Sequence, residues 1–196
     1  DVQKVLDKVA ENDPKIIEEL IPDLLGLGTI QRVLQNLLRE NVSIRDMNTI
    51  LETMADIAQY TKMPDILTEH VREALSRNIS RQYQTDDGTI PVMTLDQAIE
   101  NTIAQSIQET GQGSYLGIDP VSGEAIITAI ENSLETFSMF NYQPLVLCSP
   151  VVRPHLKRLT ERAVSNLVVL SHNEISPDVR IESLGFISLD ELAEAG

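Results

Sequence analysis

Apolar residues recur at intervals of three and four over the first 84 residues, a period that gathers side chains on one face of an α-helix. Polar residues occupy the positions between them. The pattern therefore predicts an all-helical subdomain over residues 1–84. Its apolar stripes fall in successive groups: Val2, Val5, Leu6 and Val9; Ile16, Ile17 and Leu20; Ile30, Val33, Leu34 and Leu37; Met47, Ile50, Leu51 and Met54; Leu67, Val71 and Leu75.

Helix-breaking and capping residues separate these groups. Pro22 lacks an amide hydrogen and is expected to interrupt the second helix, which Gly26–Gly28 should then end. Ser43 is the expected cap of the helix that begins near Met47, with Asp46 three residues later as in a capping box. Pro64 suits the first position of the helix after it.

Beyond the polar, turn-rich residues 84–88, short apolar runs alternate with helical patterns. Leu145–Cys148 and Leu167–Leu170 are unbroken apolar runs, typical of strands covered on both faces. A helix that Ser149 and Pro150 begin would join them as a parallel βαβ unit. Thr89–Met93 is a weaker strand candidate because Pro91 cannot donate a hydrogen bond, and Val179–Ile187 is the expected last strand.

Two further helices are expected in this half, one over Leu95–Ile107 with Thr94 as its cap, and one over Ile126–Phe137. The fold class that follows is α plus α/β. An all-helical subdomain, 1–84, precedes a small α/β subdomain, 85–196, with a βαβ unit in a mixed sheet.

The net charge of −15 argues against nucleic-acid binding, which relies on clustered Lys and Arg. The interval between Arg81 and Arg153 contains no basic residue. It reads either as a solvated acidic surface or as a docking face for a basic partner. No run is long enough to span a bilayer, and no signal peptide is visible. The chain opens on Asp1 rather than Met, so we expect a soluble, intracellular piece of a longer protein.

Few residues suggest chemistry. The glycines of Gly111–Gly117 follow a helical pattern rather than a strand, which favours a flexible helix-to-helix loop over a nucleotide site. Cys148 ends an apolar run and is expected to be a structural thiol. The alternative is a small soluble α/β enzyme with a site near Cys148, Ser149 and His172. The histidines show no metal-ligand spacing, so we expect no cofactor and no metal.

Six charged residues are candidates for subunit or partner contacts: Arg45, Asp46, Arg153, Lys157, Arg158 and Arg162. The last four have spacings that place them along one helix flank, expected to be exposed. They could engage an acidic patch on another copy or on residues 85–135, or form a solvent face with ordinary ion pairs. Arg45 and Asp46 read either as a surface base and a helix cap or as a subunit contact.

Several short sequence motifs of the helical half resemble those of a known family. VLQNLL, then VSIRDM, TILET and DILTEHVREAL, all within Gly28–Leu75, are similar to the cytosolic tail of the FHIPEP family of flagellar and type III secretion export proteins. LVVLSHNEI, at Leu167–Ile175, also resembles the flagellar branch. The matches occur at two separated places in the family's order and cover the last two subdomains of that tail.

The resemblance implies a function that composition alone does not. Such proteins have a membrane-embedded N-terminal half, absent here, and a cytoplasmic part below the bacterial inner membrane. That part forms a homo-oligomeric ring and receives flagellar export chaperones and substrates, together with other export-apparatus components. The chain is thus expected to be a non-enzymatic part of the export gate. The resemblance places the main chaperone-docking pocket chiefly upstream of Asp1.

Overall fold

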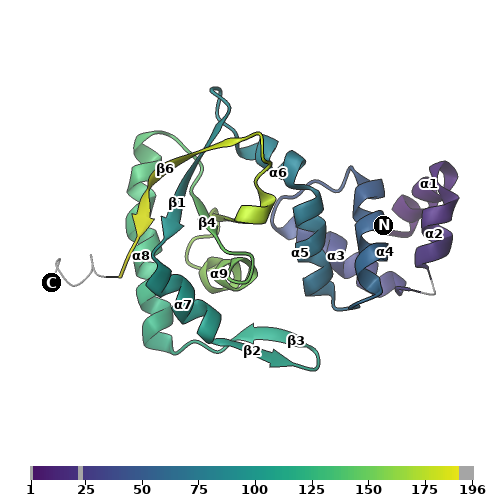
Figure 1. Ribbon diagram of the computed structural model, residues 1–196, viewed down its shortest axis with the longest axis horizontal. Helices are drawn as coiled ribbons and strands as arrows, with labels where there is room; N and C mark the ends of the chain where they lie inside the picture. Colours follow the sequence, from purple (N-terminus) through teal and green to yellow (C-terminus); the bar gives the residue numbers. More distant parts are fainter. Residues whose placement is uncertain (1, 22–23, 190–196) are drawn as a thin grey trace. The chain divides into compact units, whose positions relative to one another are not determined.

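The computed structural model describes residues 2–21 and 24–189. Its backbone contacts divide the chain into two compact units, Asp1–Ile79 and Ser80–Gly196 (Figure 1). The first is helical and the second is α/β, so the predicted fold class is confirmed. The division falls inside one helix, α6 (Ser76–Tyr83), whereas the domain boundary predicted from sequence, between residues 84 and 85, stays a prediction.

The helical unit contains α1 (Val2–Asn12), α2 (Pro14–Leu20), α3 (Leu27–Arg39), α4 (Met47–Ala58), α5 (Pro64–Ala74) and the start of α6. α5 packs against both α3 and α4, while α2 packs against α1 and α4 (Figure 1). The predicted apolar stripes meet in the interior. The fully or nearly fully buried side chains there include Ile30, Val33, Leu34, Leu37, Ile50, Leu51, Met54, Leu67 and Val71.

Two predicted helix boundaries in this unit are wrong. Asp46, not Ser43, caps α4, and its carboxylate accepts a hydrogen bond from the Thr49 amide. The Ser43 hydroxyl instead accepts one from the Arg45 amide, which shapes the turn before the helix. Gly26–Gly28 does not end α2: Gly26 caps α3 and Gly28 lies in its first turn. The predicted break at Pro22 lies outside the described residues.

The α/β unit is built on a four-stranded sheet with the order β5-β4-β1-β6. Its strands are β1 (Thr89–Leu95), β4 (Leu145–Cys148), β5 (Val168–Ser171) and β6 (Arg180–Ile187). Every pair in this sheet is parallel, so the prediction of a mixed sheet is wrong in this detail. β4 and β5 are direct neighbours joined by α9 (Arg153–Thr160), which confirms the predicted βαβ unit. The helix begins later than Ser149–Pro150, with Val152 as its cap.

Pro91 lies in β1 although it cannot donate to a sheet. Residues 89–92 pair with β6 on one side, whereas pairing with β4 on the other side starts only at Met93. The ring therefore sits where β1 still has one open side. This explains how a residue that argues against a central strand is accommodated in one.

Between β1 and β4 the chain forms α7 (Gln97–Gln105), a separate antiparallel hairpin of β2 (Ile107–Thr110) and β3 (Gly113–Leu116), and then α8 (Pro120–Met139). The prediction of a flexible loop around Gly111 is therefore wrong. Thr94 is part of β1, and Asp96 occupies the cap position of α7. Ile107 continues the helical spacing of Ile99 and Ile103 but begins a strand.

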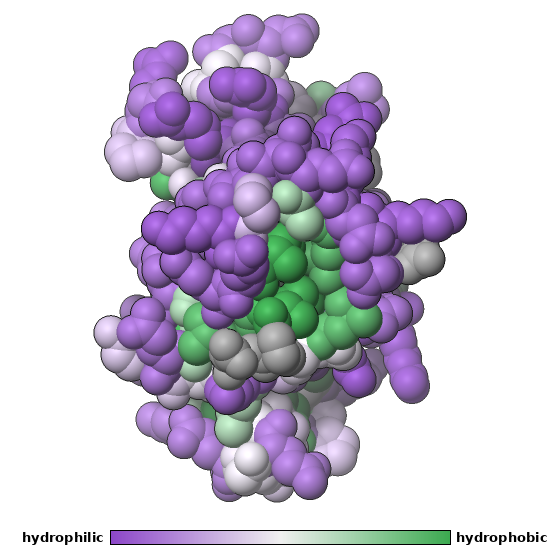
Figure 2. Space-filling model, turned by 90° about the vertical axis from the view of Figure 1, so that its right-hand side faces the viewer, coloured by the Kyte–Doolittle hydropathy of each residue, from purple (hydrophilic) through white to green (hydrophobic). Residues whose placement is uncertain are grey.

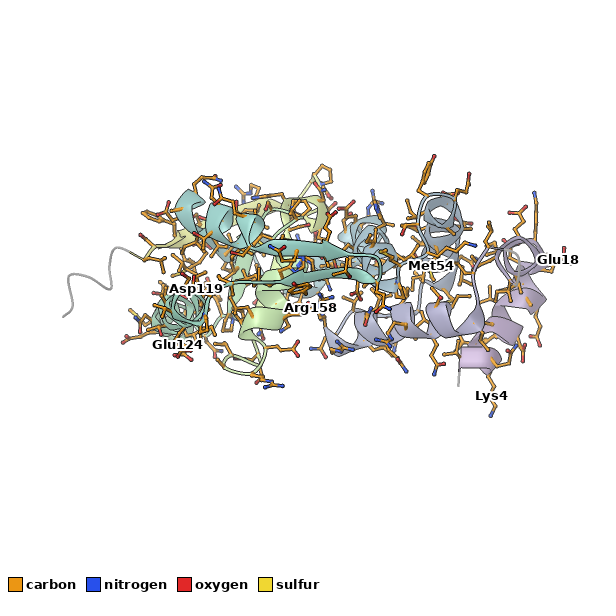
Figure 3. The ribbon with its side chains drawn as sticks, turned by 90° about the horizontal axis from the view of Figure 1, so that it is seen from below. Lys4, Glu18, Met54, Asp119, Glu124 and Arg158 are labelled. Atoms are coloured by element: carbon orange, nitrogen blue, oxygen red, sulfur yellow. The ribbon has the colours of Figure 1, made fainter. Side chains whose placement is uncertain are left out.

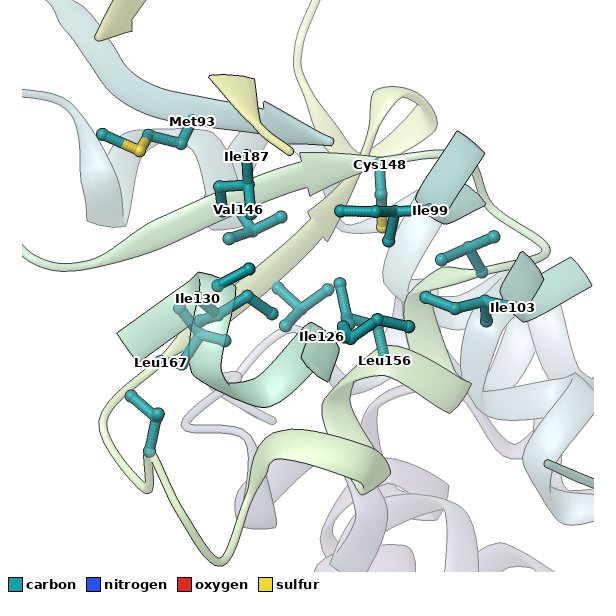
Figure 4. Close-up of a cluster of buried hydrophobic side chains, with 14 of the residues drawn as sticks. Met93, Ile99, Ile103, Ile126, Ile130, Val146, Cys148, Leu156, Leu167 and Ile187 are labelled. Atoms are coloured by element: carbon teal, nitrogen blue, oxygen red, sulfur yellow. The ribbon is translucent and has the colours of Figure 1, made fainter. Parts of the chain in front are cut away.

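Side chains of α7, α8 and α9 meet those of the strands in one core (Figure 4). Ile99 and Ile103 come from α7, and Ile126 and Ile130 from α8. The β4 side chains that face them include Cys148, which is 1% exposed. The core positions the ends of β4 and β5, and with them the polar groups of α9 and the segment that follows β5.

Candidate partner-binding surface

An apolar groove opens on the helical unit between α1 and the turn that leads into α4. Its volume is about 620 Å³. Apolar side chains from both segments line it, while polar and charged side chains stand around them: Val5, Lys8, Val9, Asn12, Ile44, Arg45, Asp46, Met47 and Asn48. Figure 2 shows that apolar side chains reach the surface among hydrophilic ones on the side of α1 and α2. A hollow of this kind can accept an apolar side chain of a partner.

Local sequence explains why the groove has this form. Val5 and Val9 are one helical turn apart, so they lie on the same face of α1. Charged residues occupy the outer faces of both helices: Lys4 on α1 and Glu18 on α2 point outward in Figure 3. Ile44 and Met47 flank the turn on the other side of the groove, and both are at least partly buried.

The two predicted contact residues of the helical unit both lie at this groove. Arg45 is exposed at its rim. Asp46 is also exposed, but its carboxylate accepts hydrogen bonds from the Thr49 amide at 3.3 Å and the Thr49 hydroxyl at 2.8 Å. Asp46 thus fixes the start of α4, and Arg45 is the group that can reach a partner.

The four predicted cations of the α/β unit do not share one exposed flank. Arg153 is 1% exposed, and its guanidinium donates to the Val169 carbonyl at 3.2 Å. Lys157 is half-buried and donates to the Leu167 carbonyl at 2.7 Å. Both cations are used to hold α9 to β5 and the residue before it. The prediction that they lie on an exposed flank is therefore wrong for Arg153, which is buried. It holds only in part for Lys157, which is half-buried.

Arg158 and Arg162 are exposed, as predicted. Arg158 is on α9 (Figure 3), and Arg162 follows the end of that helix by two residues. The exposed basic surface of this unit is thus smaller than the sequence suggested. Of the four predicted cations, only these two arginines are exposed.

Sequence reasoning missed a buried polar network behind α9. The Glu174 carboxylate lies 3.8 Å from Arg153 Nε and accepts a hydrogen bond from the Ser171 amide at 2.8 Å. The Ser80 hydroxyl of α6 donates to the Glu174 carbonyl and accepts from the Ser176 amide. Ser171-x-x-Glu174 is a capping-box pattern that could have identified Glu174. No sequence signal pointed to Ser80.

The sheet register pairs Cys148 with Ser171, so the residues of the alternative enzyme site lie at neighbouring strand ends, but the thiol is not accessible there. The Cys148 thiol is buried in the core, where it donates to the Leu170 carbonyl at 3.7 Å. His172 is exposed, in the short helix η1 (His172–Glu174). An active cysteine needs a partly exposed setting that stabilises the thiolate. Within residues 2–21 and 24–189, no cluster of three or more His, Cys, Asp or Glu side chains could hold a metal ion.

None of the helices in the described part of the chain is long and apolar enough to cross a bilayer. Known proteins are similar to this chain in both sequence and fold. The FHIPEP family model matches residues 1–180. The flagellar biosynthesis protein FlhA of Bacillus subtilis (strain 168) is 36% identical over 189 residues, which cover 96% of this chain and 28% of that protein.

Two solved structures are similar over 95% of the chain. The nonameric EscV cytosolic domain from the type III secretion system is 33% identical with a TM-score of 0.82, and the match covers 55% of that chain. CdsV in the Chlamydia pneumoniae CdsV and CdsO complex is 31% identical with a TM-score of 0.84, again over 55% of its chain. Together with the family match, these similarities establish that the chain belongs to the FHIPEP family.

Proposed function

We propose that this chain is a non-enzymatic part of the flagellar protein export gate. In this role it contributes to a cytosolic ring that receives export substrates and their chaperones. The observation that carries the proposal is the match of fold and sequence over 95% of the chain to a cytosolic domain that is nonameric in type III secretion. The 36% identity to the flagellar biosynthesis protein FlhA favours the flagellar branch of the family.

Self-association in such a ring would use the helical unit. A ring of identical copies needs two different, complementary surfaces on each copy, because each contact is head-to-tail. The groove with Arg45 at its rim has the character of one such surface: an apolar centre with a charged border. We propose that Arg45 and Asp46 lie at this subunit contact.

Arg158 and Arg162 are proposed to serve another partner. They are exposed cations on a unit with a net negative charge, so they suit an acidic patch on another export-apparatus component. CdsO in complex with CdsV is an example of a second protein bound to a relative. In this proposal the subdomains 1–84 and 85–196 have separate partners.

The chain spans 28% of the length of its flagellar relative. We propose that the remaining part of the full protein supplies the membrane attachment in the bacterial inner membrane and most of the chaperone-docking pocket. Aromatic residues, the usual anchors of interfaces, make up 4% of this chain. We therefore expect the chain alone to bind chaperone–substrate complexes weakly and to be largely monomeric at micromolar concentrations.

Sedimentation velocity over a range from micromolar to near-millimolar protein tests the ring proposal. The expected result is a weight-average mass that rises with concentration, and a constant monomer mass would contradict it. Calorimetric titration against a flagellar chaperone–substrate complex tests the docking role, with the full-length protein in detergent as the comparison. Tight binding by both would place the recognition surface within residues 1–196, contrary to the proposal.

A further inference from the structure

Tyr60 is the most exposed of the large apolar side chains in the described part of the chain, with 84% of its surface accessible. It lies two residues after the end of α4. Its amide donates to the Ile57 carbonyl at 2.9 Å, and the Thr61 amide donates to the same carbonyl at 3.1 Å. The phenol ring is therefore presented to solvent from an ordered turn. Tyrosine is among the residues that most often anchor protein interfaces.

The apolar groove lies at the opposite end of the same helix, because Met47, the first residue of α4, lines it. α4 has 12 residues. At 1.5 Å per residue its two ends are separated by about 18 Å. Tyr60 therefore cannot reach the groove of its own chain. A contact between the two can form only between different copies.

The charges beside each feature are complementary. Asp56 lies one helical turn before Tyr60, and Glu52 lies one turn before Asp56 on the same face of α4; both are exposed. The groove is lined by Lys8 and Arg45 and also by Asp46, while the exposed Lys62 follows Tyr60 by two residues. Acids are therefore in excess beside Tyr60 and cations are in excess at the groove, although both signs of charge occur on each side.

We propose that Tyr60 of one copy inserts into the groove formed by α1 and the Ile44–Asn48 turn of the next copy, with Asp56 facing Lys8 and Arg45. This inference rests on the proposed ring and specifies the contact that builds it. The groove, at about 620 Å³, is large enough for the ring of Tyr60. Since the two surfaces differ, the contact is head-to-tail, the kind that either closes into a ring or continues as an open chain.

Disulfide trapping tests the contact on the complete chain. Tyr60→Cys and Ile44→Cys are made in separate proteins, which are mixed at high concentration and oxidised. The native Cys148 is 1% exposed and stays in place. Val121→Cys mixed with Ile44→Cys is the matched control, because Val121 is 80% exposed but lies on α8 of the α/β unit.

The expected result is a cross-linked heterodimer from Tyr60→Cys and Ile44→Cys with a yield several-fold above that of the control pair. A single protein that carries both substitutions should give a ladder of multimers, since the two positions on one chain are too far apart to join. Equal yields from the two pairs would overturn the proposal. So would a predominance of Tyr60→Cys homodimers.

Sedimentation velocity separates failure of this contact from failure of the ring. Tyr60→Ala should lose most of the concentration-dependent association. Tyr60→Phe, which keeps the aromatic side chain, should retain it. If the parent associates and Tyr60→Ala associates equally well, the ring proposal stands and this contact is wrong. If the parent remains monomeric and trapping does not exceed the control, both are wrong.

Discussion

The basic residues predicted as contacts in the helical and α/β units differ in their settings. In the helical unit, Lys8 and Arg45 stand at the border of an open apolar groove. In the α/β unit, Arg153 and Lys157 point inward and donate to main-chain carbonyls of a neighbouring segment. Helical spacing alone does not distinguish the two situations. Exposure, which depends on the tertiary fold, decides which of these cations a partner can reach.

The units also differ in what holds them together. The helical unit packs local apolar stripes, and its buried Arg72 pairs at 3.7 Å with Glu40, whose side chain is 15% exposed. In the α/β unit the corresponding pair, Arg153 and Glu174, is 2% and 1% exposed. A buried ion pair that loses one partner leaves an uncompensated charge. The α/β unit should therefore be more sensitive to loss of a single polar group.

The largest effect is expected for Glu174→Ala. The substitution leaves the Arg153 guanidinium buried without its carboxylate and removes the acceptor of the Ser171 amide. We expect a loss of about 3–5 kcal/mol in the free energy of unfolding of the α/β unit, measured by urea denaturation. Glu40→Ala, at the more exposed pair, should cost less. Equal losses would remove the difference between the units.

Leu51→Ala should destabilise the helical unit by about 2–5 kcal/mol, because Leu51 is fully buried and the substitution leaves a cavity. Leu34→Ala should behave in the same way. Leu38→Ala is the matched control on α3: its side chain is 52% exposed, so the change should stay within about 0.5 kcal/mol. Thermal unfolding measures all three. If Leu34→Ala and Leu51→Ala were indistinguishable from the parent, the assigned core face would be wrong.

Ser80→Ala should cost about 1–3 kcal/mol, since it leaves the buried Glu174 carbonyl and Ser176 amide without the hydroxyl that joins them. Hydrogen exchange provides a local measurement. The Ser176 amide should exchange faster in the variant than in the parent, while amides of α3 should not change. Unchanged exchange at Ser176 would mean that Ser80 does not hold this segment to α6.

The smallest effect concerns Asp119, which caps α8. Hydrogen bonds from the Ser122 side chain and the Ser122 amide hold the pKa of this carboxyl below its ordinary value of 3.8. A lowered pKa in the folded state stabilises the fold above pH 3.8, and this contribution is lost as the pH falls through the folded-state pKa. Carboxyl chemical shifts followed by NMR should show the depression, and Ser122→Ala should diminish it.

Much of the fold could be predicted because its signals are local. The apolar stripes around Leu34 and Leu51 repeat at helical spacing, and Pro64 lies in the first turn of the helix that it begins. Leu145–Cys148 forms a strand with the predicted bounds, since an unbroken apolar run between polar turns has few other solutions. These features depend on residues within a few positions of one another.

The rest depends on distant partners. Ile107 fits the helical spacing of α7, and only pairing with Leu116 makes it part of a strand. Arg153 fits an exposed flank until Val169 and Glu174 are brought beside it by the fold. The groove likewise joins α1 to a turn more than thirty residues away. Sequence reasoning identified Arg45 and Asp46 but not the hollow beside them.

We propose that copies of this chain associate through the helical unit and not through the α/β unit. Sedimentation velocity of Arg45→Glu and Arg158→Glu tests it directly, because both arginines are exposed and each change reverses one charge. We expect Arg45→Glu to abolish the concentration-dependent rise in mass and Arg158→Glu to leave it at the parent's level. An unchanged rise for Arg45→Glu, or an equal loss for Arg158→Glu, would contradict it.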